Sequence, residues 1–79
     1  MMAGQPESDP FYIGYPGGPI VESIEVGGEG SAVLADVDAE GRIVGIEILD
    51  VNVSENVTRA RAFAAENGLA FPPGALPAA

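Results

Sequence analysis

The sequence predicts an α+β fold, a four-stranded antiparallel β-meander with one C-terminal helix packed on one face. Two observations lead to this prediction. Four short runs rich in β-branched and aromatic residues are separated by turns that contain Gly or Pro. After them, the apolar residues recur at a helical period. We expect residues 1–70 to form a single domain and residues 71–79 a flexible Pro/Ala-rich tail.

The predicted strands cover residues 11–15, 20–26, 31–37 and 41–51. The first two are separated by the turn Pro-Gly-Gly-Pro at residues 16–19, in which proline presets one dihedral angle and glycine supplies a positive φ. A hairpin turn at residues 38–41 joins the last two strands, with Gly41 in the left-handed conformation. Short connections favour pairing between consecutive strands. The fourth strand is the longest β-branched run, and we expect it at the centre of the sheet.

A helix is predicted over residues 54–67. Ser54 can cap its first turn, and Glu55 suits the positive end of the helix dipole. The dipeptide Asn67-Gly68 is a stop signal. One narrow apolar face follows from the spacing, and it should pack closely on the sheet. The residues on this face are Val53, Val57, Ala60 and Ala64.

Side chains alternate between the two faces of a sheet, and the helix can cover only one of them. The covered face is expected to hold Phe11, Ile13, Tyr15, Ile20, Ile24, Val26, Val33, Ala35, Val37, Val44, Ile46 and Ile48. The opposite face is less polar than a solvent-facing sheet normally is, and such a surface typically binds a partner. The alternative is that scattered exposed apolar residues have no partner. The candidate partner-binding residues are Tyr12, Leu34, Ile43, Leu49 and Val51.

Composition excludes several classes of function. The chain has three arginines, no lysine, twelve acidic residues and a formal net charge of −9, so binding to nucleic acid or to an anionic membrane is not expected. It also has no cysteine or histidine, which removes the common zinc sites and Cys- or His-based catalysis. No apolar run approaches the roughly 20 residues of a membrane span. We expect a cytoplasmic protein without cofactor, bound metal or catalytic residues, and not an enzyme.

One motif resembles a calcium-binding loop. Counted from Asp36, acidic residues fall at the first, third, fifth and twelfth positions, and glycine falls at the sixth. This is close to the EF-hand loop. However, the flanking sequence is β-like on both sides, and Glu47 would lie far along a strand from the turn. We therefore favour a hairpin in which Asp38 starts the turn, and we keep calcium binding as a weaker alternative.

Three segments resemble the small bacterial domain-of-unknown-function family twenty-two eighty-three. They are PESDPFYI at residues 6–13, VES at residues 21–23 and ADVDAEGRIVGIEIL at residues 35–49. The resemblance covers about residues 5–52 and is most specific in the hairpin. It implies a compact β-meander with a C-terminal helix that commonly self-associates. It implies no assigned activity and no catalytic residues. Some members lie beside toxin-like genes, which suggests an antitoxin-like binding role.

The sequence therefore predicts a small acidic, non-enzymatic protein-protein interaction module of a bacterium or phage. We expect it to form a homodimer, to bind a host or toxin-like protein, or both. One alternative is an acidic mimic that blocks a basic nucleic-acid-binding surface. Calcium binding is the third and least favoured reading.

Overall fold

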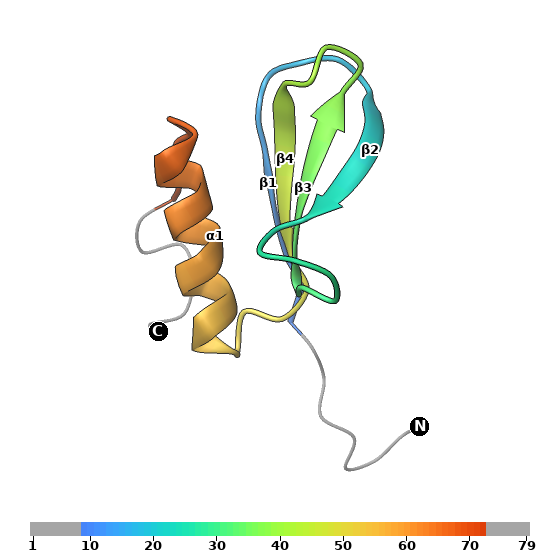
Figure 1. The fold of residues 1–79 in the computed structure, drawn as a ribbon. Helices are drawn as coiled ribbons and strands as arrows, with labels where there is room; N and C mark the ends of the chain where they lie inside the picture. Colours follow the sequence, from blue (N-terminus) through green and yellow to red (C-terminus); the bar gives the residue numbers. More distant parts are fainter. Residues whose placement is uncertain (1–8, 73–79) are drawn as a thin grey trace.

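A computed structural model describes residues 9–72 of the chain. It contains four strands followed by one helix (Figure 1). The strands are β1 (Phe11–Gly14), β2 (Ile20–Glu25), β3 (Val33–Asp38) and β4 (Ile43–Ile48), and the helix is α1 (Ser54–Glu66). All the strand pairs in the sheet are antiparallel. The predicted α+β class is thus confirmed, while residues 73–79 of the predicted tail lie outside the described residues.

The strand order is β1-β4-β3-β2. Strands β2, β3 and β4 form the expected meander, but β1 pairs with β4 and not with its neighbour in sequence. The expectation of consecutive pairing throughout is therefore wrong for β1. Three consecutive strands joined by hairpins (β2, β3 and β4), with β1 placed beside β4, form a Greek-key arrangement. Strands β1 and β2 consequently form the two edges of the sheet.

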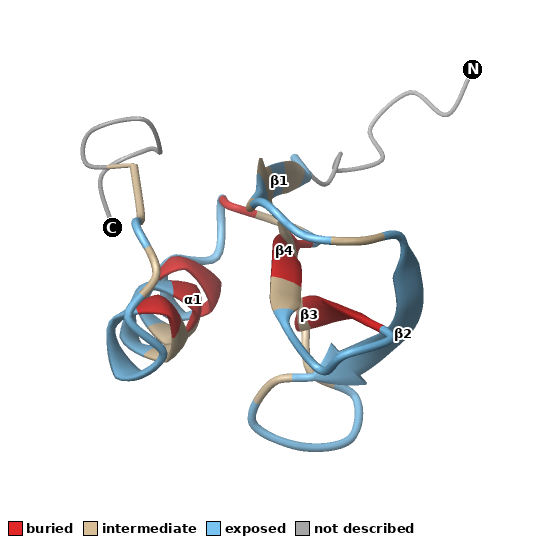
Figure 2. Cartoon of the chain, turned by 90° about the horizontal axis from the view of Figure 1, so that it is seen from above, coloured by how far each residue is buried: buried red, intermediate tan, exposed pale blue. Residues whose placement is uncertain are grey.

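Residues 15–19 carry the chain from one edge to the other across the end of a curled sheet (Figure 2). The loop is fixed to the strands that it crosses. The N–H group of Tyr15 donates to the Val44 carbonyl at 2.9 Å, and the Gly18 N–H donates to the Asp38 carboxylate at 3.0 Å. Between them, Gly17 lies directly over Val44, where a Cβ atom would overlap the valine side chain. A loop without a side chain at this point can pass close to β4, which explains glycine at position 17.

The predicted hairpin between β3 and β4 is present. Gly41 has φ of +82°, and its N–H group donates to the Asp38 carbonyl at 3.0 Å. The Asp38 carboxylate also accepts hydrogen bonds of 2.9 Å from the backbone of Glu40 and Arg42, and one of 2.8 Å from the Arg42 guanidinium. One buried carboxylate therefore ties the β3–β4 turn to the loop that crosses the sheet.

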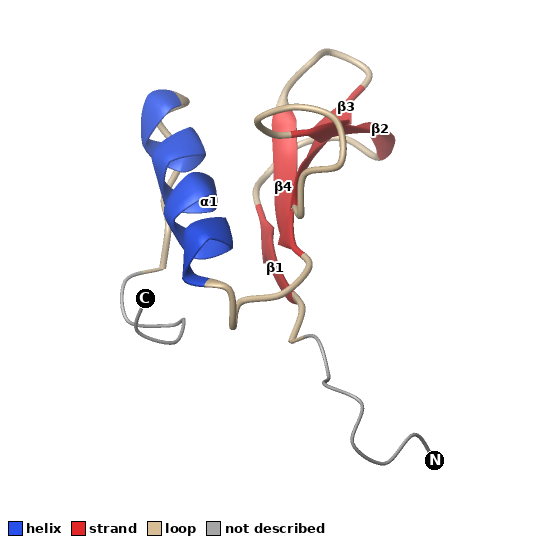
Figure 3. Ribbon diagram, turned by 60° about the horizontal axis from the view of Figure 1, so that its bottom comes forward, coloured by secondary structure: helices blue, strands red, loops and turns tan. Residues whose placement is uncertain are grey.

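Helix α1 packs on β3 and β4 (Figure 3). Its alanines let the helix approach the sheet closely, because they present no bulk beyond Cβ. The core residues that meet in this layer are Val33, Ile46, Ile48, Val51, Val57, Ala60 and Ala64.

The ends of the helix differ in how well they were predicted. The N-cap residue is Val53, without a side-chain cap hydrogen bond, so the expected Ser54 cap is wrong by one residue. Asn56 instead donates from its amide group to the Asp50 carbonyl at 2.9 Å. The predicted stop is present, with Gly68 at φ of +68° and the Leu69 N–H bonded to the Ala64 carbonyl.

Candidate functional site

The structure separates the five residues predicted to bind a partner. Tyr12 and Leu49 are exposed, and Leu34 is half-buried. Val51 is only 6% exposed and belongs to the core beneath the helix, so its predicted place on an uncovered face is wrong. The reason is that β4 ends at Ile48, and the following bend turns Val51 inward, where its N–H group bonds the Asp9 carbonyl.

The predicted position of Ile43, which followed from simple alternation of side chains along β4, is also wrong. The register between β3 and β4 shifts after Asp36, so Val37 pairs with Ile43 and an extra residue is accommodated in β4. Ile43 lines a hollow of about 540 Å³ together with Tyr15 and Leu69, the latter from the segment after α1. It therefore lies on the helix side of the sheet, and the predicted residues do not form one surface.

The face opposite the helix is held together by polar groups. Asp36 is 1% exposed, and the Ser23 hydroxyl donates to it at 2.6 Å. A hydrogen bond with Asp36 raises the pKa of the neighbouring Glu47, and burial and the Asp36 charge raise it further. The Glu47 carboxyl group therefore keeps its proton to a higher pH than an isolated glutamate would.

Tyr12 of β1 pairs with Glu47 of β4 across the strands. Its side chain covers Gly45, where a Cβ atom would overlap the phenol ring. Burial raises the pKa of Tyr12, and the charges of Asp36 and Glu47 add to the effect. In the described part of the chain every buried side-chain nitrogen or oxygen has a hydrogen-bond partner. The buried Asp36 carboxylate is thus satisfied within this face, by the Ser23 hydroxyl.

The residues of the calcium-like motif are split between two places. Asp36 and Glu47 belong to the cluster just described. Asp38 lies in the turn. The hydrogen bond from the Gly18 N–H lowers the pKa of its carboxyl group most, burial raises it, and the hydrogen bonds from Arg42 and Glu40 lower it further. The net effect holds the pKa of Asp38 well below its usual range. Within residues 9–72, no group of three or more acidic side chains is placed to hold a metal ion.

Strand β2 is the feature that the sequence pattern did not single out. All six of its residues are exposed, and in Figure 2 it contrasts with the buried positions of β3 and β4. Ile20, Val21 and Ile24 are exposed by 51%, 62% and 47%. Ile20 and Ile24 were expected under the helix, and this expectation is wrong because α1 packs on β3 and β4 and does not extend over β2 (Figure 1).

A groove runs between the end of β2 and α1. Its volume is about 570 Å³, with Ile24 and Val26 on the strand side and Ala62 and Phe63 on the helix side. Arg59 crosses one end, against Gly27, and its guanidinium bonds the Ser31 hydroxyl at 3.4 Å. We call the exposed strand and this groove together the β2 edge site.

Comparison with known proteins finds a match for the segment that forms the sheet and none for the helix. Within residues 9–72 no helix is long and apolar enough to cross a membrane. No curated protein and no solved structure matches the chain. One family model matches residues 5–52, which is more than half of the chain and includes all four strands but not α1. The chain therefore belongs to the family described as protein of unknown function DUF2283.

Proposed function

We propose that this protein is a small non-enzymatic module that binds another protein chain at the β2 edge site. The observation that carries the proposal is a fully exposed edge strand with three large apolar side chains. Single exposed apolar residues are ordinary, but an apolar edge strand is a template for pairing with another chain. The adjoining groove extends the apolar surface toward α1.

The partner in this proposal is a second copy, which would give a homodimer, or a different protein. A host or toxin-like protein of a bacterium or phage is the partner that the family resemblance favours, with the module acting like an antitoxin. A cytoplasmic location belongs to the same proposal. Both kinds of partner would lose apolar contact if the β2 edge site became charged.

The second candidate is an acidic mimic that occupies a basic nucleic-acid-binding surface. It is favoured by the net charge of −9 and by the exposure of Glu22 and Glu25 on the same strand. Mimicry depends on charge pairs that salt screens, whereas an apolar interface does not. A steep loss of affinity between low and physiological ionic strength would favour the mimic.

The test compares two charged double variants. One carries Val21→Lys with Ile24→Lys in the β2 edge site, and the matched control carries Tyr12→Lys with Leu49→Lys elsewhere on the exposed surface. Both change the net charge equally, and NMR spectra check that each remains folded. We expect the first variant to lose concentration-dependent mass in light scattering and protein capture from host lysate, and the control to retain them.

Two results would overturn the proposal. One is a wild-type protein that stays monomeric at all concentrations and captures no protein. The other is the reverse pattern, in which the control variant loses binding and the β2 variant keeps it.

A further inference from the structure

The edge of β2 has backbone groups available for another strand. The Val26 N–H donates to the Val33 carbonyl at 2.9 Å, which marks a hydrogen-bonded pair. The same register pairs Ile24 with Ala35. In an antiparallel ladder, hydrogen-bonded and non-hydrogen-bonded pairs alternate. The intervening residues Ser23 and Glu25 therefore direct their N–H and C=O groups away from β3, toward the open edge.

The side chains at this edge alternate in character. Ile24 faces the helix side and lines the groove with Ala62 and Phe63. Neighbouring residues of a strand point to opposite faces, so Ser23 and Glu25 lie on the other face. By the same alternation Glu22 lies on the face of Ile24, nearer the start of the strand. A strand added beside Ser23 to Glu25 would therefore meet Ile24 and the groove on one face and the Glu25 carboxylate on the other.

The charges around the site are mostly negative. Glu22 and Glu25 are exposed on β2, and the groove is also lined by Glu55 and Glu66 of α1. The basic side chain at the groove, Arg59, is already engaged, because it lies 3.9 Å from the Glu55 carboxylate and bonds Ser31. Such a site attracts Lys and Arg side chains and repels acidic ones.

A second copy fits this edge poorly. Each copy carries a net charge of −9, so like charges oppose association. Two edge strands of identical sequence would also bring four exposed glutamates together. The register shift between Ile20 and Glu22 adds an irregularity to the start of the strand. Charges and bulges on an edge are features that prevent a sheet from pairing with itself.

We infer that the β2 edge site takes an extended segment of another protein in which Lys or Arg alternates with apolar residues. The segment adds to the sheet as a strand beside β2, through the outward backbone groups of Ser23 and Glu25. Its apolar side chains face Ile24 and the groove, and its basic side chains face Glu25. This inference rests on the proposed protein-binding function and specifies the chemistry of the partner.

The probe is a capped nine-residue peptide, KTVKVRVTK, titrated into the isotope-labelled protein. The matched control peptide is ETVEVEVTE, which keeps the apolar residues and reverses the charge. We expect saturable NMR shifts at β2 and the groove with the basic peptide alone. Hydrogen exchange at the Ser23 and Glu25 amides should slow about tenfold or more when the peptide is bound, because both N–H groups gain a partner.

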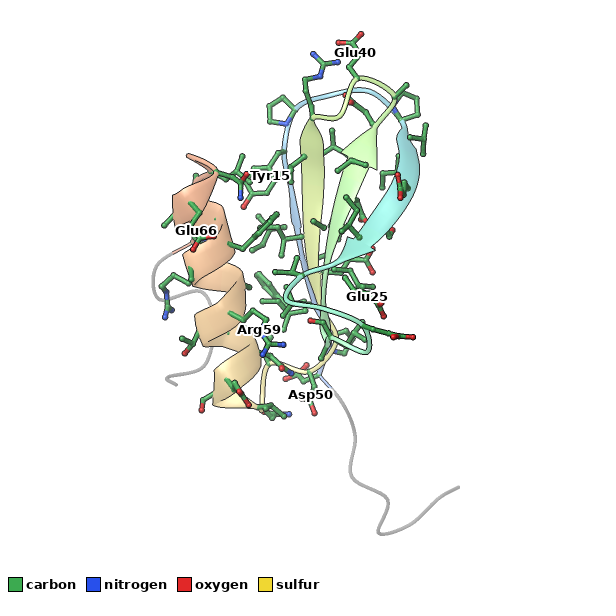
Figure 4. All side chains as sticks on the ribbon, viewed as in Figure 1. Tyr15, Glu25, Glu40, Asp50, Arg59 and Glu66 are labelled. Carbon is green, nitrogen blue, oxygen red and sulfur yellow. The ribbon has the colours of Figure 1, made fainter. Side chains whose placement is uncertain are left out.

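A pair of protein variants isolates the local charge. Glu25→Lys reverses the charge on β2 that the basic side chains would face, whereas Glu40→Lys makes the same charge change in the β3–β4 turn. Figure 4 shows Glu40 at the opposite end of the molecule from Glu25 and Arg59. We expect Glu25→Lys to weaken binding of the basic peptide at least fivefold more than Glu40→Lys does.

Four results would overturn the inference. The first is that the basic peptide does not bind at a 1:10 protein-to-peptide ratio up to about millimolar concentration, the range of weak complexes. The second is that the acidic peptide binds equally well, and the third is that the NMR shifts lie away from β2. The fourth is that the Ser23 and Glu25 amides are already protected from exchange in the free protein. If any of these occurs while Val21→Lys with Ile24→Lys still abolishes dimer mass or protein capture, the proposed function stands. In that case the occupant is a second copy or a chain of different chemistry.

Discussion

Substitution of Gly17 by alanine tests the strand order on which the β2 edge site depends. If the strands paired consecutively, β2 would lie between β1 and β3 and would have no open edge. It lies at the edge because residues 15–19 cross the end of the sheet. The crossing brings Gly17 against Val44, and a Cβ atom there would also lie 3.2 Å from the Asp38 carboxylate.

The expected cost follows from the immobility of the neighbour. Val44 is buried, and its β-branched side chain has few alternative rotamers. Overpacking of this kind costs about 1–3 kcal/mol. Gly17 does not have a positive φ, so the loss would come from the overlap and not from backbone strain. In a domain of this size each kcal/mol lowers the melting temperature by about 4–8 °C.

The assay is urea unfolding followed by circular dichroism, with Gly14→Ala as the control. A Cβ atom at Gly14 would lie 3.5 Å from the Tyr12 ring, which is an ordinary contact, so this variant should change stability by less than about 1 kcal/mol. The double variant Gly17→Ala with Val44→Ala should be destabilised by about 1 kcal/mol less than the sum of the two single variants, because the smaller side chain at position 44 removes the overlap. Wild-type stability of Gly17→Ala, or strict additivity in the double variant, would refute the crossing.

Three further predictions concern the core and the carboxyl groups. Val57→Ala, at a fully buried helix position, should cost about 2 kcal/mol in urea unfolding, while the exposed Val53→Ala should cost less than about 0.5 kcal/mol. The pKa of Glu47 is raised in the folded protein, so ionisation of Glu47 should lower the stability of the wild type as pH rises from about 4 through that pKa. Glu47→Gln should therefore unfold at a higher urea concentration than the wild type at pH 7, and the difference should vanish near pH 3.5. The pKa of Asp38 is lowered, so its contribution to folding stability is present above about pH 4 and is lost in stronger acid. Asp38→Asn should lower the urea midpoint at pH 7, by an amount that shrinks below about pH 4. A difference that stays unchanged across this range would contradict the assignment.

The candidate site could be predicted only in part. The sequence correctly indicated that one helix would leave apolar residues uncovered. It placed them on the face opposite the helix, and two of the predicted residues, Tyr12 and Leu49, are exposed. The exposure of Ile20 and Ile24 on β2 was not expected. The alternating pattern of β2 is the same for a central strand as for an edge strand, so no local signal marked Ile24 as exposed.

The sequence by itself determined the local elements of this protein. β-branched runs, the turn at residues 38–41, the helical spacing of Val57, Ala60 and Ala64, and the stop at Gly68 each depend on neighbours within a few residues. Only the tertiary structure decided which strands pair. A five-residue connection with two glycines can close a hairpin or cross the end of a curled sheet. The choice depends on packing against Val44 and Asp38, which are both more than twenty residues away from Gly17 in the sequence. That non-local contact places β1 beside β4 and leaves β2 as the open edge.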